Sequence, residues 1–225
     1  MKTTAMICAY NEEETIKEVV STVANFYFNE IIVVNDGSTD KTDEILKKLN
    51  KQYRFKYIVL PENKGKGFAM ATGIENAENE IIVFIDADLN KLIATHFEQL
   101  IQPIFDKKAD MVLGQPNETL INYSLNPFKS FTGERSLFKE DILPIIDKMK
   151  ESRFGVETLI NLYYQSKGKK VKYVMLDGLK HPSKFDKTSS IKAMKEFANE
   201  GLQIISTVFK NFNLITSSIK NKINL

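Results

Sequence analysis

One stretch of the chain constrains its fold more than any other. Residues 81–85 are five consecutive apolar residues, most of them β-branched, and Asp86 and Asp88 follow at once, one residue apart. A short apolar run of this kind is typical of a buried strand in a parallel sheet. In open α/β sheets, ligands bind at the carboxyl ends of the strands. The stretch therefore predicts a core strand that delivers two carboxylates to a ligand-binding edge.

The two carboxylates point to the same side if the strand conformation persists beyond Asp86. Carboxylate oxygens are hard ligands that suit Mg²⁺ or Mn²⁺, so Asp86 and Asp88 can face one cation or a cation-bound diphosphate. The alternative interpretation is a solvated turn after a core strand. An isolated Asp-x-Asp does not decide between the two, so the choice depends on the rest of the chain.

The composition favours one globular domain with short appendages. The 225 residues are 43% hydrophobic and 27% charged, which is ordinary for a globular protein, and no linker-like segment divides them. The one cysteine, Cys8, cannot form a disulfide within the chain, and its apolar surroundings favour a small buried side chain in a reducing compartment. No signal-peptide pattern or run of 18 apolar residues occurs, so we expect a cytoplasmic protein.

Strand and helix patterns alternate through the first half of the chain. This alternation predicts a mostly parallel sheet with right-handed crossovers. Asn11 is the expected N-cap of the first helix, whose buried face is Ile16, Val19, Val20 and Val23. Pro103 is expected to interrupt the fourth helix. The expected strands are 1–9, 30–35, 56–60, 81–85, 109–114 and 172–176, and the expected helices after the second, third and fourth strands begin near residues 41, 67 and 94.

Two common nucleotide-binding folds are excluded by the turns. The first strand-to-helix turn, residues 9–14, is acidic and lacks glycine, whereas a dinucleotide-binding fold needs Gly-x-Gly-x-x-Gly there. A sugar nucleotidyltransferase would also want a glycine-rich first turn. The segment 64–67 does not match a P-loop. What remains is a sheet edge lined by Asp36, Asp86, Asp88 and a basic loop with two glycines, residues 64–67, which we call the basic loop.

Four short motifs at this edge resemble the successive motifs of family 2 glycosyltransferases with the GT-A fold. They follow in the family's order: Ala9-Tyr10-Asn11-Glu12, residues 33–40, residues 63–67 and Asp86-Ala87-Asp88. The resemblance covers roughly residues 3–115 and implies an α/β fold, a Rossmann-like mostly parallel sheet flanked by helices. It implies one catalytic domain over residues 1–188, with a nucleotide-sugar half (1–115) and an acceptor half (116–188), followed by a C-terminal amphipathic helical extension (189–225).

The resemblance also implies a site for a nucleoside diphosphate sugar. Asp36 would accept a hydrogen bond from the base, and Asp88 would ligate Mg²⁺ or Mn²⁺. Asp86 would contact the sugar, the ribose or the metal shell. Helix capping remains an alternative for Asn11 and Glu12, as turn formation does for Asp36. Lys64 and Lys66 either approach the phosphates or are solvated. The implied donor contacts are Ala9, Tyr10, Asn11, Glu12, Asp36, Lys64, Gly67, Asp86 and Ala87.

The acceptor half carries three further candidates. Gly133 and Arg135 resemble the Gly-x-Arg segment of relatives that use phosphorylated acceptors, so Arg135 would grip a phosphate or carboxylate with two hydrogen bonds. Its alternative is a structural arginine that bridges loops. Arg153 would serve the acceptor or the diphosphate. These three residues are the expected acceptor contacts.

Glu157 is the candidate general base. It opens a helix where related enzymes place an acidic residue beneath the acceptor hydroxyl, and an inverting displacement needs that hydroxyl deprotonated. With retention of configuration, Glu157 would instead orient the donor sugar. A glutamate favoured by the helix dipole in the first turn is the structural alternative. Asp86 and Glu157 are the expected catalytic pair.

The chain has two histidines, and the resemblance distinguishes them. His181 follows a strand in a Gly/Pro-punctuated loop, as does the metal-binding histidine of many GT-A enzymes, so it would complete the site begun by Asp88. His96 falls inside a helix and is expected to be structural or solvated. The expected cofactor is therefore Mg²⁺ or Mn²⁺, held by Asp88 and His181.

The C-terminal segment is amphipathic and basic. From Ile191 to Phe212, apolar residues recur at helical intervals, and residues 184–225 hold seven lysines against three acidic residues. Three interpretations stay open: a membrane-interface helix at the inner face of the membrane, a homodimer contact, or a helix packed on its own domain. A net charge of +2 gives no indication of a nucleic-acid partner.

The function expected from these residues is metal-dependent hexose transfer. The donor would be a UDP-sugar rather than a GDP-sugar such as GDP-mannose, and the acceptor would bear a hydroxyl or phosphate, on a small molecule or a lipid. Gln115-Pro116 stands where lipid-phosphate relatives place an arginine, which disfavours a polyprenyl phosphate. The alternative is a noncatalytic nucleotide-sugar-binding or scaffolding protein of the same fold.

Overall fold

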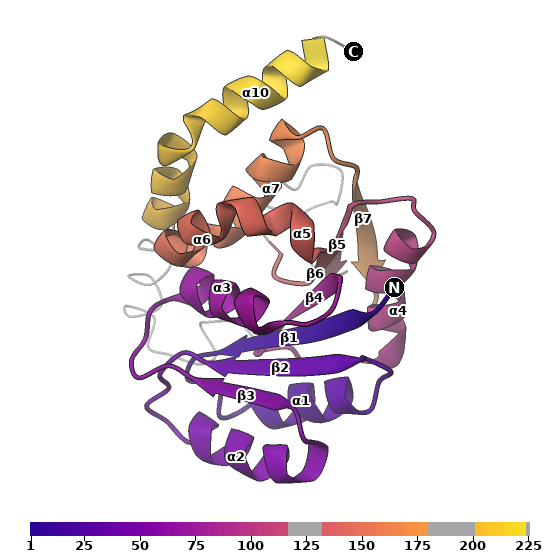
Figure 1. Ribbon diagram of the computed structural model, residues 1–225. Coiled ribbons are helices and arrows are strands. Elements are labelled where there is room, and N and C mark those ends of the chain that lie inside the picture. Colours follow the sequence, from indigo (N-terminus) through magenta and orange to yellow (C-terminus); the bar gives the residue numbers. More distant parts are fainter. Residues whose placement is uncertain (117–131, 180–200, 224–225) are drawn as a thin grey trace.

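The computed structural model describes residues 1–116, 132–179 and 201–223 (Figure 1). Within them, the strands form one seven-stranded sheet in the order β3-β2-β1-β4-β6-β5-β7. The strands are β1 (Thr3–Ala9), β2 (Glu30–Asn35), β3 (Lys56–Val59), β4 (Ile81–Asp86), β5 (Met111–Pro116), β6 (Arg135–Phe138) and β7 (Val171–Leu176).

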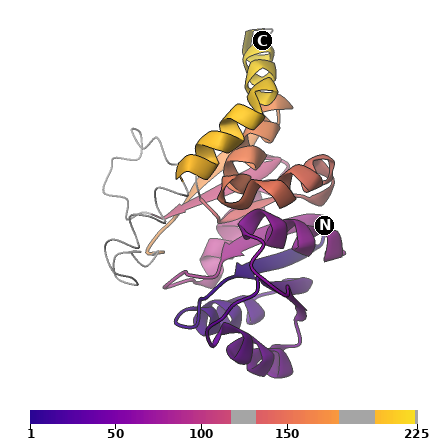
Figure 2. The same ribbon diagram turned by 90° about the vertical axis from the view of Figure 1, so that its left-hand side faces the viewer.

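Helices cover both faces of the sheet (Figures 1 and 2). Side chains of α1, α2 and α4 join one buried hydrophobic cluster, and those of α3, α6 and α7 join a second cluster on the opposite face. The helices are α1 (Ile16–Ala24), α2 (Thr42–Tyr53), α3 (Lys66–Asn76), α4 (Ala94–Phe105), α5 (Lys139–Ile142), α6 (Ile146–Ser152), α7 (Val156–Ser166) and α10 (Phe212–Ile223), with 3-10 turns η2 (Leu143–Ile145) and η3 (Arg153–Gly155).

The strand directions place three strand ends at one edge. β1 pairs in parallel with β2 and with β4, so the carboxyl ends of all three lie together. β6 runs antiparallel to β4 and to β5, and β7 runs parallel to β5. The near-continuous apolar runs of β1, β2 and β4 suit central strands that are covered on both faces. The mostly parallel sheet predicted from the sequence is confirmed, with β6 as its antiparallel member.

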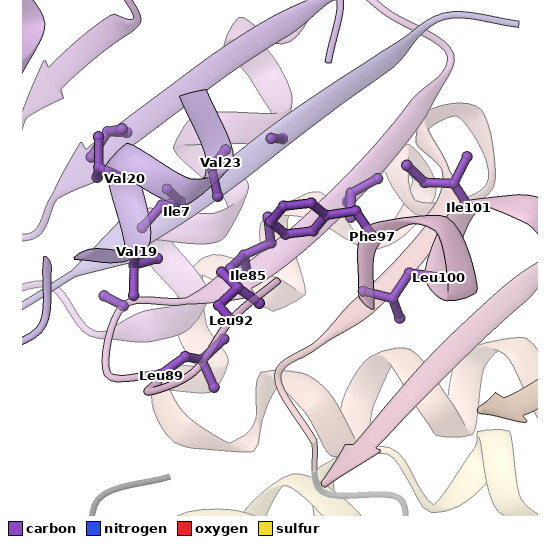
Figure 3. Close-up of a cluster of buried hydrophobic side chains, with 14 of the residues drawn as sticks. Ile7, Val19, Val20, Val23, Ile85, Leu89, Leu92, Phe97, Leu100 and Ile101 are labelled. Carbon is purple, nitrogen blue, oxygen red and sulfur yellow. The ribbon is translucent and has the colours of Figure 1, made fainter. Parts of the chain in front are cut away.

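A hydrophobic cluster fixes the carboxyl end of β4. Figure 3 shows Ile85 at the end of the strand and Leu89 and Leu92 just beyond it, packed beside Val19 of α1 and Phe97 of α4. All five side chains are buried. Apolar contacts with α1 and α4 therefore fix the backbone that carries Asp86 and Asp88, and this limits where the two carboxylates can lie.

Two local predictions were wrong. Asn11 does not cap α1, because the helix begins at Ile16 after Thr15, and Asn11 instead adopts a left-handed backbone conformation with φ of 56°. Pro103 does not interrupt α4, which continues to Phe105. Pro103 lies in the last turn of the helix, where its missing N–H removes only one hydrogen bond near the end.

No helix in the described ranges is long and apolar enough to span a membrane.

Candidate active site at the carboxyl edge of the sheet

The turn after β4 is pinned to the start of α1. The hydroxyl of Thr15 donates a hydrogen bond to the backbone carbonyl of Ala87 at 2.8 Å. Ala87 is itself buried, between Asp86 and Asp88. Together with the hydrophobic cluster beneath it, this contact fixes the backbone that carries both acidic side chains.

Lys66 joins the two predicted catalytic residues. Its ammonium group lies 2.7 Å from Oδ1 of Asp86 and 2.7 Å from Oε1 of Glu157. The three side chains come from the first turn of α3, the end of β4 and the first turn of α7. Asp86 and Glu157 are far apart in sequence, and the structure brings them to one partly buried cation. Lys66 is thus an ion-pair centre, a role that the sequence interpretation did not assign.

Carboxylates outnumber cations around this centre. Burial and the charges of Glu134, Glu157 and Asp88 raise the pKa of Asp86 to about 7, although Lys66 acts to lower it. Burial alone would raise the pKa of Glu157, but the charges of Lys66 and Arg135 hold it below its ordinary value. For Lys66, the attraction of the two carboxylates outweighs burial and raises its pKa. The excess of negative charge is a setting that favours a further cation.

Gly133 and Arg135 lie next to the ion pairs of Lys66 with Asp86 and Glu157. A Cβ atom on Gly133 would fall 2.0 Å from Oδ2 of Asp86, so only glycine leaves room for that carboxylate. Arg135 is fully buried on β6, and its guanidinium donates to the carbonyl of Thr132 and, at 3.3 Å, to Oδ1 of Asn161. This placement matches the structural interpretation of Arg135, and a contact with an acceptor remains a prediction.

Asp36 ties two of the predicted donor loops together. Its carboxylate oxygens accept hydrogen bonds from the backbone N–H groups of Lys64 and Gly65, each at 2.8 Å. Burial raises the pKa of Asp36, although both hydrogen bonds act to lower it. Gly37 has a φ of 68°, and a Cβ there would collide with the backbone of Glu62. Asp36 therefore shapes the edge, and its contact with a base remains a prediction.

Hydrogen bonds connect the loop between β1 and α1 to the loop between β2 and α2. The N–H of Asn11 donates to the hydroxyl of Ser38 at 3.0 Å, and the side-chain oxygen of Asn11 accepts from the N–H of Thr39 at 2.8 Å. The N–H of Glu12 donates to the hydroxyl of Thr42 at 2.8 Å. Ala9 is buried and Tyr10 is exposed beside them. The motif from Ala9 to Glu12 thus lies at the same edge as Asp36.

The basic loop packs against α6 and η3, within the predicted acceptor half. Gly65 has a φ of 94°, and a Cβ there would come within 2.9 Å of Cγ of Arg153. A Cβ on Gly67 would lie 2.2 Å from the carbonyl oxygen of Met149. Arg153 therefore lies against the loop that Asp36 holds. The side chain of Lys64 is exposed and pairs with Glu62, so its approach to a phosphate is untested.

The two histidines have different outcomes. His96 is buried: Nδ1 accepts from the N–H of Ile93 at 3.3 Å, which leaves Nε2 to donate to the carbonyl of Asp177 at 3.0 Å. The structural interpretation of His96 is confirmed, with the added finding that it fixes the loop after β7 against the start of α4. His181 lies outside the described residues, and its role as a metal ligand stays a prediction.

The side chains after β4 fit a hard divalent cation. Asp86 and Asp88 offer carboxylate oxygens, the ligand type that Mg²⁺ and Mn²⁺ prefer, in surroundings with excess negative charge. Across residues 1–116, 132–179 and 201–223, no three His, Cys, Asp or Glu side chains gather as a ready-made metal cluster. The described part of the chain thus supplies Asp88 and its neighbour Asp86 to the predicted metal site.

A cavity lies away from this edge of the sheet. It has a volume of about 280 Å³ and is lined by residues of α5 and α7 and by Lys169, which precedes β7. None of the sequence motifs reaches this cavity.

The thiol of Cys8 lies near Lys66 and Asp86. Burial raises the pKa of this thiol to about 12, so it stays protonated and unreactive.

Replacing Lys66 with methionine is expected to lower the free energy of unfolding by about 3 kcal/mol at neutral pH, because it leaves two largely buried carboxylate side chains, 20% and 14% exposed, without their cation. Ionised Glu157 stabilises the wild-type fold above its unfolded pKa, and this contribution is lost as the pH falls through its depressed folded pKa. The deficit of the variant should therefore shrink as the pH falls below about 4, the ordinary range of a glutamate. Urea unfolding at neutral pH and at successively lower pH values measures this deficit.

Lys64→Met is the matched control for this substitution. Lys64 precedes Lys66 by two residues but forms an exposed pair with Glu62, so its loss should change the free energy of unfolding by less than about 0.5 kcal/mol. Equal destabilisation by both substitutions, or a Lys66→Met deficit that does not depend on pH, would contradict the proposed ion-pair centre.

Comparisons with known proteins identify relatives of this chain by sequence. The family model described as glycosyl transferase family 2 matches residues 4–199. The poly-beta-1,6-N-acetyl-D-glucosamine synthase of Staphylococcus epidermidis is 39% identical over 85 residues, which are 37% of this chain and 21% of the synthase. The synthase of the same name from Staphylococcus aureus is 38% identical over 87 residues, 38% of this chain and 21% of that protein. The chain thus matches about a fifth of the length of these relatives.

Solved structures resemble the whole fold. A crystal structure of glucosyl-3-phosphoglycerate synthase from Mycobacterium tuberculosis with Mn²⁺, uridine diphosphate and glucosyl-3-phosphoglycerate has a TM-score of 0.73 and 19% identity, over 93% of this chain and 79% of that one. The same synthase with Mn²⁺, uridine-diphosphate-glucose and glycerol 3-phosphate has a TM-score of 0.72 and 18% identity, with the same coverage. At this identity the likeness establishes the arrangement of the sheet and helices.

Proposed function

Because the chain belongs to glycosyl transferase family 2, we propose that it transfers a hexose from a nucleoside diphosphate sugar to an acceptor hydroxyl. The observation that carries the proposal is the contact of Lys66 with both Asp86 and Glu157. Asp86 belongs to the predicted donor half and Glu157 to the predicted acceptor half. A cation shared between them lies where the reacting sugar would have to meet its acceptor.

The fold suits this reaction. The sheet and its helices have the GT-A arrangement, and the loops after β1, β2 and β4 meet at one edge, as a donor site requires. In the proposed site, the segment from Ala9 to Glu12 and the carboxylate of Asp36 border the nucleotide. The backbone near Gly67 and the side chain of Lys64 approach the phosphates.

The proposed donor is a UDP-sugar and the proposed acceptor is a small phosphorylated molecule. The similar synthase from Mycobacterium tuberculosis was crystallised with uridine diphosphate and phosphoglyceric acid, and with uridine-diphosphate-glucose and glycerol 3-phosphate, which supports both choices. Arg153, beside the basic loop, is the proposed phosphate contact of the acceptor.

A divalent cation is the proposed cofactor. Asp88 would hold it, with Asp86 beside it and His181 as the further predicted ligand. When bound, Mg²⁺ or Mn²⁺ would neutralise part of the negative charge that develops on the departing diphosphate. The solved synthase structures with Mn²⁺ or Mg²⁺ and uridine diphosphate support this choice.

Glu157 is the proposed proton acceptor in an inverting reaction. Lys66 and Arg135 lower its pKa, so the carboxylate is ionised at neutral pH and can take the proton of the acceptor hydroxyl. The hydroxyl oxygen then forms the bond to the anomeric carbon as the bond to the diphosphate breaks. In a retaining reaction, Glu157 would instead fix the orientation of the donor sugar.

The proposal is tested by nucleotide release. The purified chain is expected to release UDP from UDP-glucose or UDP-N-acetylglucosamine in the presence of Mn²⁺ and an acceptor such as 3-phosphoglycerate or glycerol 3-phosphate. GDP-mannose is the competing donor, and removal of the metal with a chelator should abolish release. Binding of UDP without turnover for every donor and acceptor would favour the noncatalytic nucleotide-sugar-binding protein.

A further inference from the structure

We propose that the C-terminal helical segment, residues 201–223, docks this protein onto an anionic lipid surface. Residues 201–210 are helical, Asn211 is in a turn, and α10 runs from Phe212 to Ile223. Figures 1 and 2 show this segment along the outside of α6 and α7, away from the sheet. The proposal does not depend on the transferase reaction.

One face of the segment is fixed to the acceptor half. Thr207 is buried, and its hydroxyl lies where a Cβ on Gly155 would collide at 1.9 Å. The side-chain oxygen of Gln203 accepts from the N–H of Phe154 at 3.1 Å, and that of Asn211 accepts from the ammonium of Lys148 at 3.4 Å. Residues 203, 207 and 211 are spaced four apart, so they form one stripe along the helix.

The opposite face is apolar and exposed. Leu202, Ile205, Phe209 and Phe212 are 64%, 53%, 75% and 59% exposed. The spacing of Leu202, Ile205 and Phe209 by three and four residues places them together, on the side away from the stripe that contacts the domain, and Phe212 begins α10 three residues after Phe209. Packing on the domain therefore accounts for one face of the helix but leaves four large apolar side chains in solvent, an arrangement that marks an interaction surface.

The width of the apolar face favours a lipid surface. Ile204, Val208 and Ile215 are partly exposed and extend the face to one side of the four exposed residues. A coiled-coil seam is narrow and confined to two positions of each heptad. A broad apolar arc with bulky phenylalanines is the pattern of a helix that lies in the plane of a membrane interface.

The charges favour an anionic partner over a second copy of the chain. Residues 201–225 hold three lysines and no acidic residue. Two such helices facing each other would bring like charges together and could form no ion pair between their segments, whereas paired coiled coils use complementary charges beside the seam. Anionic phospholipid headgroups supply the missing negative charge.

Vesicle flotation tests the proposal. The full chain is expected to float with vesicles of equal parts phosphatidylcholine and phosphatidylglycerol, weakly with phosphatidylcholine alone, and less at high salt. The double substitution Phe209→Asn and Phe212→Asn should reduce binding to the anionic vesicles by about tenfold or more, since two exposed rings no longer bury apolar area. Lys210→Glu should also weaken binding.

Tyr27→Asn is the matched control. Tyr27 is 90% exposed in the segment between α1 and β2. The substitution therefore removes an exposed aromatic ring that lies outside the apolar face of the C-terminal segment. This variant should float as the wild type does. Equal flotation of the wild type and the double variant, or equal binding to both kinds of vesicle, would overturn the proposal. A third outcome would also overturn the proposal: the wild type binds no vesicles but forms a concentration-dependent dimer, and the double substitution abolishes that dimer.

Discussion

Replacing Glu157 with glutamine is expected to reduce sugar transfer by about 10² to 10⁴-fold while UDP binding stays within about threefold of the wild type. Glutamine keeps the shape of the side chain but cannot take a proton from an acceptor hydroxyl. Glu157 contacts Lys66 from the first turn of α7, on the proposed acceptor side of the site. Its loss should therefore act on turnover rather than on the nucleotide.

Single-turnover rates and UDP titrations of the same variant separate these effects. Glu18→Gln is the matched control, because Glu18 also lies in the first turn of a helix but is exposed on α1. The control should keep full activity, and circular dichroism should show that both variants fold. A Glu157→Gln enzyme with near-normal turnover would leave only the structural role of a glutamate at a helix start.

Replacing Asp88 with asparagine is expected to weaken UDP binding in Mn²⁺ on the order of 100-fold and to abolish measurable transfer. An amide oxygen is a poorer ligand for a hard cation than a carboxylate is. Asp88 lies close enough to Asp86 for its charge to raise the pKa of that carboxyl. The substitution also removes one of the negative charges around Lys66, so the fold should not be destabilised.

The matched control for this substitution is Asp106→Asn. Asp106 follows α4 and pairs with Lys108 at the surface, at 2.8 Å. Its replacement removes the same charge without touching the β4 turn, so metal-dependent UDP binding should be unchanged. If the Asp88→Asn variant needs no more Mn²⁺ than the wild type does, Asp88 is not a ligand and the two aspartates have only a local structural role.

Most of the sheet could be predicted because its central strands are apolar runs and its helices have regular buried faces. The run from Ile81 to Ile85 became β4, and Ile16, Val19, Val20 and Val23 face the core as expected. β6 was not predicted, since it is four residues long and includes Arg135 and Ser136, whose burial depends on partners elsewhere in the chain.

The candidate site could be predicted only in part. Motif order placed Asp36, Asp86 and Glu12 at one edge, because strand ends in a parallel sheet must meet there. The pairing of Lys66 with Glu157 could not be predicted, because it joins residues 91 positions apart through the packing of α3 against α6. The same packing explains why position 67 is a glycine, since a Cβ there would collide with the carbonyl oxygen of Met149.

Backbone geometry explains the remaining difference. Asn11 has the residue type of an N-cap, yet its positive φ turns it toward the second loop, where it binds the N–H of Thr39. Asparagine tolerates this conformation better than most residues. Local sequence cannot distinguish a cap from such a turn, since both use the same side-chain oxygen.

Calorimetric titration of UDP, with and without Mn²⁺, into the wild type and Asp88→Asn tests the central claim most directly. The account predicts that UDP binds the wild type, that Mn²⁺ strengthens this binding, and that Asp88→Asn removes the effect of the metal. GDP titrated in the same way should bind more weakly. Failure of both nucleotides to bind the wild type in Mn²⁺, or UDP binding that neither the metal nor Asp88 affects, would contradict the account.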